Sequence, residues 1–170
     1  MTIAGRVIVL LISMVLISAC TLKGTPRHSL AELKTALLNH DAREAFKYVD
    51  VDSIVEHMVE DMFAQRESRS RTSLDAFGVA MGRSIASVLL PEAKQLIRKE
   101  VRGAIESGDE TGYFEQIRRA SVWYLTIEEE GDVALVTPRR DDKVRFKMER
   151  TGEGYWKIVQ IIVQNRRRSP

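Results

Sequence analysis

The side chains that could do chemistry in this chain fall into two groups. Cys20 is the only cysteine, and it directly follows an apolar run from Val7 to Ile17 and the dipeptide Ser18-Ala19. Its thiolate would be a nucleophile able to form a covalent bond. The second group supplies the carboxylates, imidazole and phenol that general acid–base catalysis uses. Its members lie close together in the sequence: Tyr48, Asp50, Asp52 and His57.

The residues around Cys20 resemble the signal peptide of a bacterial lipoprotein, with a cationic start, a short apolar region and small residues before the cysteine. The resemblance implies that residues 1–19 are removed and that acylated Cys20 anchors the chain to a bilayer. A membrane-spanning helix is disfavoured, because it needs about 20 apolar residues, whereas the segment from Val7 to Ala19 is thirteen residues long and includes Ser13 and Ser18. Cleavage without acylation is the other alternative, and it would leave a free thiol in an oxidising compartment.

Thr21 follows the cysteine, where an aspartate would resemble an inner-membrane retention signal. We therefore expect a bacterial envelope protein, held on the outer membrane and facing the periplasm if the host has two membranes.

Composition predicts one domain behind this anchor. Residues 20–28 read as a lipidated tether, residues 29–163 as a single α+β domain, and residues 164–170 as a basic, disordered tail. Removing Arg6 with the signal peptide leaves 25 of the 26 basic side chains against 24 acidic ones. This balance argues against a nucleic-acid partner. Lys23 and Arg27 in the tether either contact anionic head groups or serve solubility.

Helical spacing of the apolar residues predicts about four to five helices between Ser29 and Gly108. The third of them carries an apolar stripe from Ile54 to Phe63, and the polar segment Gln65–Ser73 behind it reads as an exposed loop. Pro91 suits the first turn of a further helix, which Gly108 would end. The capping patterns that place the first three helix starts are Ser29 with Glu32, Asp41 with Glu44, and Asp50 or Asp52.

The segment Leu74–Leu90 is rich in small and aliphatic residues. It contains Gly78 and Gly82 in a G-x-x-x-G pattern, which lets two helix backbones approach closely. Asp75 and Arg83 argue against a membrane span, so a helix packed in the core is favoured over a membrane-inserting hairpin.

Beyond Arg119 the apolar period changes from 3.6 to 2, which predicts strands at residues 121–128, 133–137, 143–149 and 155–163. Short turns between them indicate an antiparallel meander. The expected fold class is α+β, with N-terminal helices on one face of a C-terminal four-stranded sheet. Gln160 shares a strand face with Trp156 and Ile158. A strand covered on both sides, a β-bulge and a polar pocket would each explain this position.

Four short segments stand in a recognisable order: Lys47-Tyr48-Val49-Asp50, Asp75-Ala76-Phe77-Gly78, Leu90-Pro91-Glu92 and Gly154-Tyr155-Trp156-Lys157-Ile158. Together they resemble a family of bacterial envelope proteins classed only as a domain of unknown function. The resemblance spans Leu30 to Val163 and implies a fold related to the cystatin-like, nuclear-transport-factor-2-like group, in which helices pack into the concave side of a curved sheet. It implies no activity, and it gives no role to the loop from Arg66 to Arg71.

The function favoured is a non-catalytic binding or assembly module, held at the bilayer by acylated Cys20. Its partner would be an unidentified envelope protein, lipid or small-molecule ligand, and no cofactor or metal is expected. Two surfaces are candidates for binding: the strand face with Lys143, Arg145 and Lys147, and the arginines of the tail, Arg166–Arg168.

The alternative is an acid–base enzyme for a small molecule, with a carboxylate in a conical apolar pocket. It requires a cavity lined by Trp123, Phe146 and Trp156. Asp50 and Asp52 are better explained as helix caps. His57 and Asp61 have a spacing that can bind a metal on a helix, but no third ligand is near in the sequence, so a solvated face is favoured.

Overall fold

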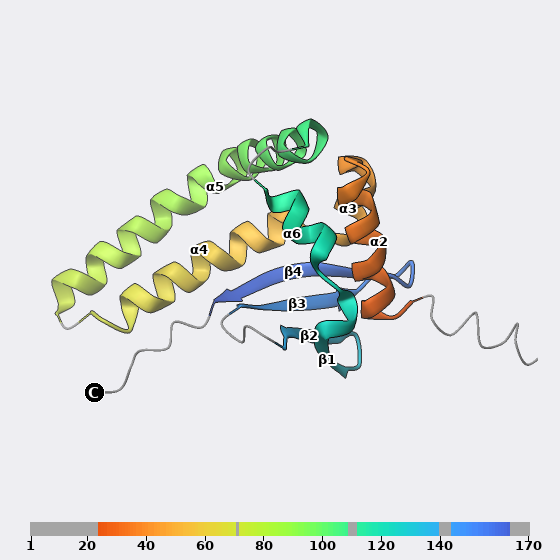
Figure 1. Ribbon diagram of the computed structural model, residues 1–170. Helices are drawn as coiled ribbons and strands as arrows, with labels where there is room; N and C mark the ends of the chain where they lie inside the picture. The colour runs from red at the N-terminus through yellow and green to blue at the C-terminus, as the bar shows by residue number, and fades with distance from the viewer. Residues whose placement is uncertain (1–23, 71, 109–111, 140–143, 164–170) are drawn as a thin grey trace, which may run out of the picture.

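The computed structural model describes residues 24–70, 72–108, 112–139 and 144–163 (Figure 1). The helices are α2 (Pro26–Leu38), α3 (Ala42–Tyr48), α4 (Val51–Glu67), α5 (Ser73–Ser107) and α6 (Tyr113–Arg119), followed by the 3₁₀ turn η1 (Val122–Tyr124). The strands are β1 (Leu125–Glu130), β2 (Val133–Pro138), β3 (Val144–Arg150) and β4 (Trp156–Val163). They pair antiparallel in the order β1-β2-β3-β4. The predicted α+β class, with helices ahead of a four-stranded meander, is therefore confirmed.

The core lies between the sheet and the helices α2, α3 and α4. The strands turn alternate residues toward it, as the period of 2 predicts, so that Ala134, Val136 and Met148 are fully buried. Trp156 closes the core at the start of β4. The helices contribute small and branched side chains that pack against this layer: Leu30, Leu33, Ala36, Ala45 and Ile54.

A β-bulge in β4 explains the position of Gln160. Lys147 pairs with Gln160 whereas Met148 pairs with Ile158, so Val159 is the extra residue of the bulge. Ile158 and Val159 are consequently both buried, although they are neighbours in one strand. The side-chain amide of Gln160 donates to Oδ2 of Asp61 on α4 at 3.4 Å. Of the three explanations that the sequence left open, the bulge is confirmed.

The first helix begins at Pro26 rather than at Ser29. Thr25 is its N-cap, because its side chain accepts from the backbone N–H of His28 at 3.2 Å. Ser29 lies inside the helix and is 1% exposed. The prediction of Ser29 as a cap is therefore wrong, and the folded part of the chain starts within the segment predicted to be a tether.

Helix α5 departs furthest from the prediction. Pro91 lies inside it, where we expected the start of a new helix. Figure 1 shows α5 bending near its middle, as a helix does where a proline interrupts its hydrogen bonds. Its apolar N-terminal half is not buried, so the prediction of a core helix is wrong. Gly108 ends α5 in the left-handed conformation, as predicted.

Two further boundaries differ from the predictions. α4 continues to Glu67, so the segment predicted as a loop from Gln65 is partly helical. Residues 113–119 form α6, a helix that the sequence pattern did not predict. The 3₁₀ turn η1 occupies the place where we expected the first strand to begin.

The direction of α4 determines which segments of the chain lie at each end of the molecule. The backbone N–H of Asp50, the N-cap of α4, donates to the carbonyl of Ile158 at 2.9 Å, and Asp61 contacts Gln160 further along β4. α4 therefore runs in the same direction as β4. The turn between α4 and α5 lies toward the C-terminal end of β4, whereas α2 begins beside the start of β4 (Figure 1).

Candidate functional site

The two carboxylates proposed for catalysis act as a helix cap and an ion-pair partner. Oδ1 of Asp50 accepts from the backbone N–H of Ser53 at 3.1 Å, which confirms Asp50 as the N-cap of α4. Asp52 forms a salt bridge with Arg98 of α5. Both line a hollow of about 300 Å³ whose wall also carries Arg102 and Lys157. This charged wall differs from the apolar pocket that the enzyme alternative requires.

Tyr48 lies beside the turn between β3 and β4. Its ring meets the ring of Tyr155 edge-on, with centroids 5.7 Å apart. Burial raises the pKa of both phenols above the usual 10.0. A phenol with a raised pKa stays protonated at neutral pH, which disfavours Tyr48 as a base.

The histidines are bound within the fold. Nδ1 of His57 lies 2.7 Å from the carbonyl of Ser53, so it must carry the proton and donate. Asp61 contacts Gln160 instead of joining His57. Among the described residues, no cluster of three or more His, Cys, Asp and Glu side chains could hold a metal ion. Nδ1 of His40 lies 3.1 Å from the carbonyl of Ile105 and links the α2–α3 corner to α5.

The three aromatic residues expected to line a catalytic cavity lie in different environments. Trp123 is 69% exposed on η1. Trp156 is buried, and its indole N–H donates to the carbonyl of Gly24 at 2.7 Å. Phe146 packs against the core. The three side chains therefore do not line the single cavity that the enzyme alternative requires.

The basic surfaces proposed from the sequence are only partly available. Lys147 forms a salt bridge with Glu149 at 2.8 Å, and Arg145 is half-buried. Arg27 belongs to α2, where Nη2 donates to the carbonyl of Leu125 at 3.2 Å and the guanidinium lies over the ring of Trp123. These contacts within the fold disfavour, for Arg27, the contact with anionic head groups that was one of the two alternatives left open by the sequence. The remaining candidates lie outside the described residues: Cys20, Lys23, Lys143 and Arg166–Arg168.

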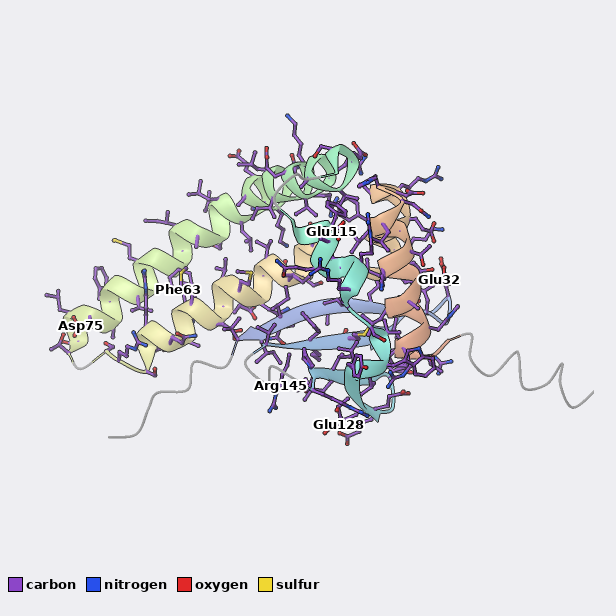
Figure 2. All side chains as sticks on the ribbon, viewed as in Figure 1. Glu32, Phe63, Asp75, Glu115, Glu128 and Arg145 are labelled. Atoms are coloured by element: carbon purple, nitrogen blue, oxygen red, sulfur yellow. The ribbon has the colours of Figure 1, made fainter. Side chains whose placement is uncertain are left out.

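The most prominent surface in the structure is instead the hairpin formed by α4 and α5. Phe63 of α4 is 5% exposed and points toward α5, where a Cβ at Gly82 would meet its ring at 3.4 Å (Figure 2). The guanidinium of Arg83 also lies over the Phe63 ring, 5.8 Å from its centroid. The same side chain forms a salt bridge with Glu67 at 3.1 Å. The close helix approach that the G-x-x-x-G pattern predicts therefore does occur at Gly82, between α4 and α5 of the hairpin.

On its outer side α5 carries a second apolar row. Its members recur at helical spacing, on the side of α5 opposite to Ala86 and Leu90, which face α4. Each member is more than half exposed. They are Leu74, Phe77, Met81, Ile85 and Val88, which we call the outer stripe. Its ends are fourteen residues apart, so it is about 21 Å long. Covering five such side chains would be worth on the order of 5 kcal/mol.

The outer stripe is also free of charge. From Ala76 to Pro91 the only charged residue of α5 is Arg83, which pairs with Glu67. By length and composition α5 is the one helix among the described residues that could cross a membrane. A contiguous exposed apolar area of this kind marks a site of interaction with protein or membrane.

Cationic side chains stand beside the stripe at the turn of the hairpin. A hollow of about 530 Å³ lies there, with Arg66, Arg69 and Ser70 on one side and Leu74 and Val79 on the other. Both arginines are exposed, and no ion pair joins either of them to a described residue. The hollow therefore combines two guanidinium groups, a hydroxyl group, an apolar wall and the carboxylate of Asp75, which belongs to the capping box of α5.

The sequence contains a pattern that indicates this surface, although we interpreted it as a helix packed in the core. Apolar residues occupy two opposite sides of α5 between Leu74 and Leu90, whereas a helix on the outside of a domain needs only one such side. Comparisons of the chain with protein-family models, with curated proteins and with solved structures give no match. The resemblance to an envelope domain family therefore stays a prediction.

Proposed function

We propose that the protein is an envelope lipoprotein, anchored by acylated Cys20, that acts as a non-catalytic binding module through its α4–α5 hairpin. The observation that carries this proposal is the outer stripe, because five apolar side chains in one row on a single helix are not needed by the fold. Their exposure is explained if another molecule or a membrane covers them.

The packing of the domain supports this division into a body and a binding arm. The core between the sheet and α2, α3 and α4 is closed by Met148 and Trp156 without the outer stripe. The carboxylates and histidines discussed above take part in caps, ion pairs and hydrogen bonds of the fold. The chemically distinctive surface that is left is apolar and cationic, which suits binding.

Replacing Cys20 by Ser tests the anchor. In cells, the wild-type chain should fractionate with membranes and its N-terminal peptide should carry acyl chains by mass spectrometry. The Cys20→Ser chain should lack the acyl mass and keep the signal peptide. A matched Ser18→Ala variant retains the cysteine and should be acylated like the wild type. An unmodified Cys20 in the wild-type chain would overturn the proposed anchor.

A further inference from the structure

We propose that the hairpin tip docks on an anionic lipid bilayer other than the one that holds Cys20, so that the protein bridges two membrane surfaces. The tip comprises Arg66, Arg69 and the outer stripe. This inference rests on the proposed lipid anchor. To the proposed function it adds the identity of the surface that the hairpin binds.

The tether and the hairpin tip lie at opposite ends of the molecule. Gly24, the first described residue, is held by the Trp156 indole at the start of β4. The start of α4 lies beside Ile158, about 7 Å further along the strand, and α4 extends the distance by about 25 Å. The end of α4 that carries Arg66 is therefore about 30 Å from the point where the tether enters the fold.

The layers of the fold also separate the tether from the outer stripe. α4 packs on β4, and α5 packs on α4. The stripe lies on the side of α5 away from α4, two layers of about 10 Å from the strand that holds Gly24. The four residues from Cys20 to Gly24 span at most ~14 Å. A tether of this reach does not allow Cys20 and the stripe to enter the same bilayer surface.

The chemistry of the tip matches an anionic lipid. Apolar side chains of the size of Leu74 and Phe77 enter the boundary between head groups and acyl chains, and exposed arginines beside them attract anionic head groups. The hollow of about 530 Å³ at the tip combines these two features in one place. The nearby carboxylates of α4 are bonded within the fold, because Glu56 pairs with Lys94 of α5 and Asp61 accepts from Gln160 of β4.

A second copy of the chain fits this surface less well. Two stripes facing each other would bury an area at the lower end of what a specific protein interface needs, because each offers only five side chains. Pairing two copies in parallel would also bring Arg66 and Arg69 of one hairpin against those of the other, and antiparallel pairing would place the arginines of the two copies at opposite ends. An anionic surface satisfies both arginines.

The test uses the full, acylated chain in donor vesicles of phosphatidylcholine. Fluorescent acceptor vesicles contain either phosphatidylcholine alone or phosphatidylcholine with phosphatidylglycerol, and carry no protein. We expect donors to capture the anionic acceptors, and capture to fall at high salt because the arginine contribution is screened. The acyl mass of Cys20 in the donors is measured in the same sample, so a failed anchor is distinguished from a failed bridge.

Matched variants locate the contact. Phe77→Glu with Ile85→Glu should reduce capture at least tenfold, since Glu is a good helix former but does not enter the bilayer. Leu96→Glu is the control, because Leu96 is 60% exposed on the charged half of the same helix. Arg66→Glu with Arg69→Glu should reduce capture about thirtyfold or more. Arg43→Glu, on exposed α3, should leave capture unchanged.

Three results would overturn the proposal. Capture only when the acceptors also carry the protein would show that a second copy covers the stripe. Equal capture of neutral and anionic acceptors would refute the role of the arginines. Donors that capture nothing, although Cys20 is acylated and circular dichroism shows a folded chain, would refute the bridge itself.

Discussion

The backbone N–H of Trp156 donates to Oγ of Ser29 at 2.9 Å, across 127 residues of chain. Ser29 is 1% exposed and Trp156 is 2% exposed, so water does not compete for this bond. It joins α2 to the first residue of β4, and the indole of the same tryptophan holds Gly24. One residue therefore fixes both the first helix and the end of the tether.

Replacing Ser29 by Ala should lower the free energy of unfolding by about 1–3 kcal/mol, because the N–H of Trp156 would be left buried without a partner. Urea unfolding followed by tryptophan fluorescence measures this loss. Ser87→Ala is the control, since Ser87 is exposed on α5 and its hydroxyl bonds only to its own helix. Equal stability of the two variants would show that the Ser29 bond contributes nothing.

The sequence predicted best the features that depend on neighbouring residues. The caps at Asp41 and Asp50 and the left-handed end at Gly108 each need only a few adjacent side chains, and all are found. The meander was predictable for the same reason, because short turns leave few other ways to pair the strands.

The features that the sequence did not predict depend on distant residues. Ser29 resembles a cap in its local pattern, but the hydroxyl is taken by Trp156. Pro91 resembles a helix start, but α5 continues through it. Because Ser87 and Pro91 are both exposed, the carbonyl of Ser87 that loses its partner can bond to water. Composition alone could not show whether the apolar residues of α5 face the core or an external surface.

Replacing Gly108 by Ala should destabilise the protein by at least about 2 kcal/mol. Gly108 has φ of 65°, where a side chain is strained, and an added Cβ would lie 2.7 Å from Cε1 of His40. Gly103→Ala is the matched control inside the same helix, where a Cβ meets nothing within 4 Å. It should be neutral or stabilising by up to about 1 kcal/mol. Thermal unfolding of both variants is the measurement, and a Gly108→Ala protein as stable as Gly103→Ala would refute the clash.

Asp50 should act through its capping bond and not through catalysis. Asp50→Ala is expected to cost about 1 kcal/mol of stability, because the N–H of Ser53 loses its acceptor. Asp50→Asn should retain most of the stability, since Asn caps helices as well as Asp does. Glu60→Ala, on the exposed side of α4, controls for the loss of a carboxylate. Denaturant titrations at neutral pH compare the three, and a loss in Asp50→Asn equal to that in Asp50→Ala would contradict the cap.

Tyr48 and Tyr155 should make the fold sensitive to alkali. Burial is the main cause that raises the pKa of both phenols above the usual 10.0. The folded state therefore binds these two protons more tightly than the unfolded state. Their contribution to stability is fully present below about pH 10 and is lost as the pH rises through the raised pKa values of the folded protein.

Absorbance of the phenolate during a pH titration measures the ionisation of these groups, and urea unfolding between about pH 8 and about pH 11 measures its effect on stability. Tyr48→Phe and Tyr155→Phe should each remove one late-titrating phenol and flatten the alkaline loss of stability. Tyr124→Phe is the control, because Tyr124 is 58% exposed. If the two variants lost stability with pH as steeply as the control, burial at the Tyr48–Tyr155 contact would not be what makes the fold alkali-sensitive.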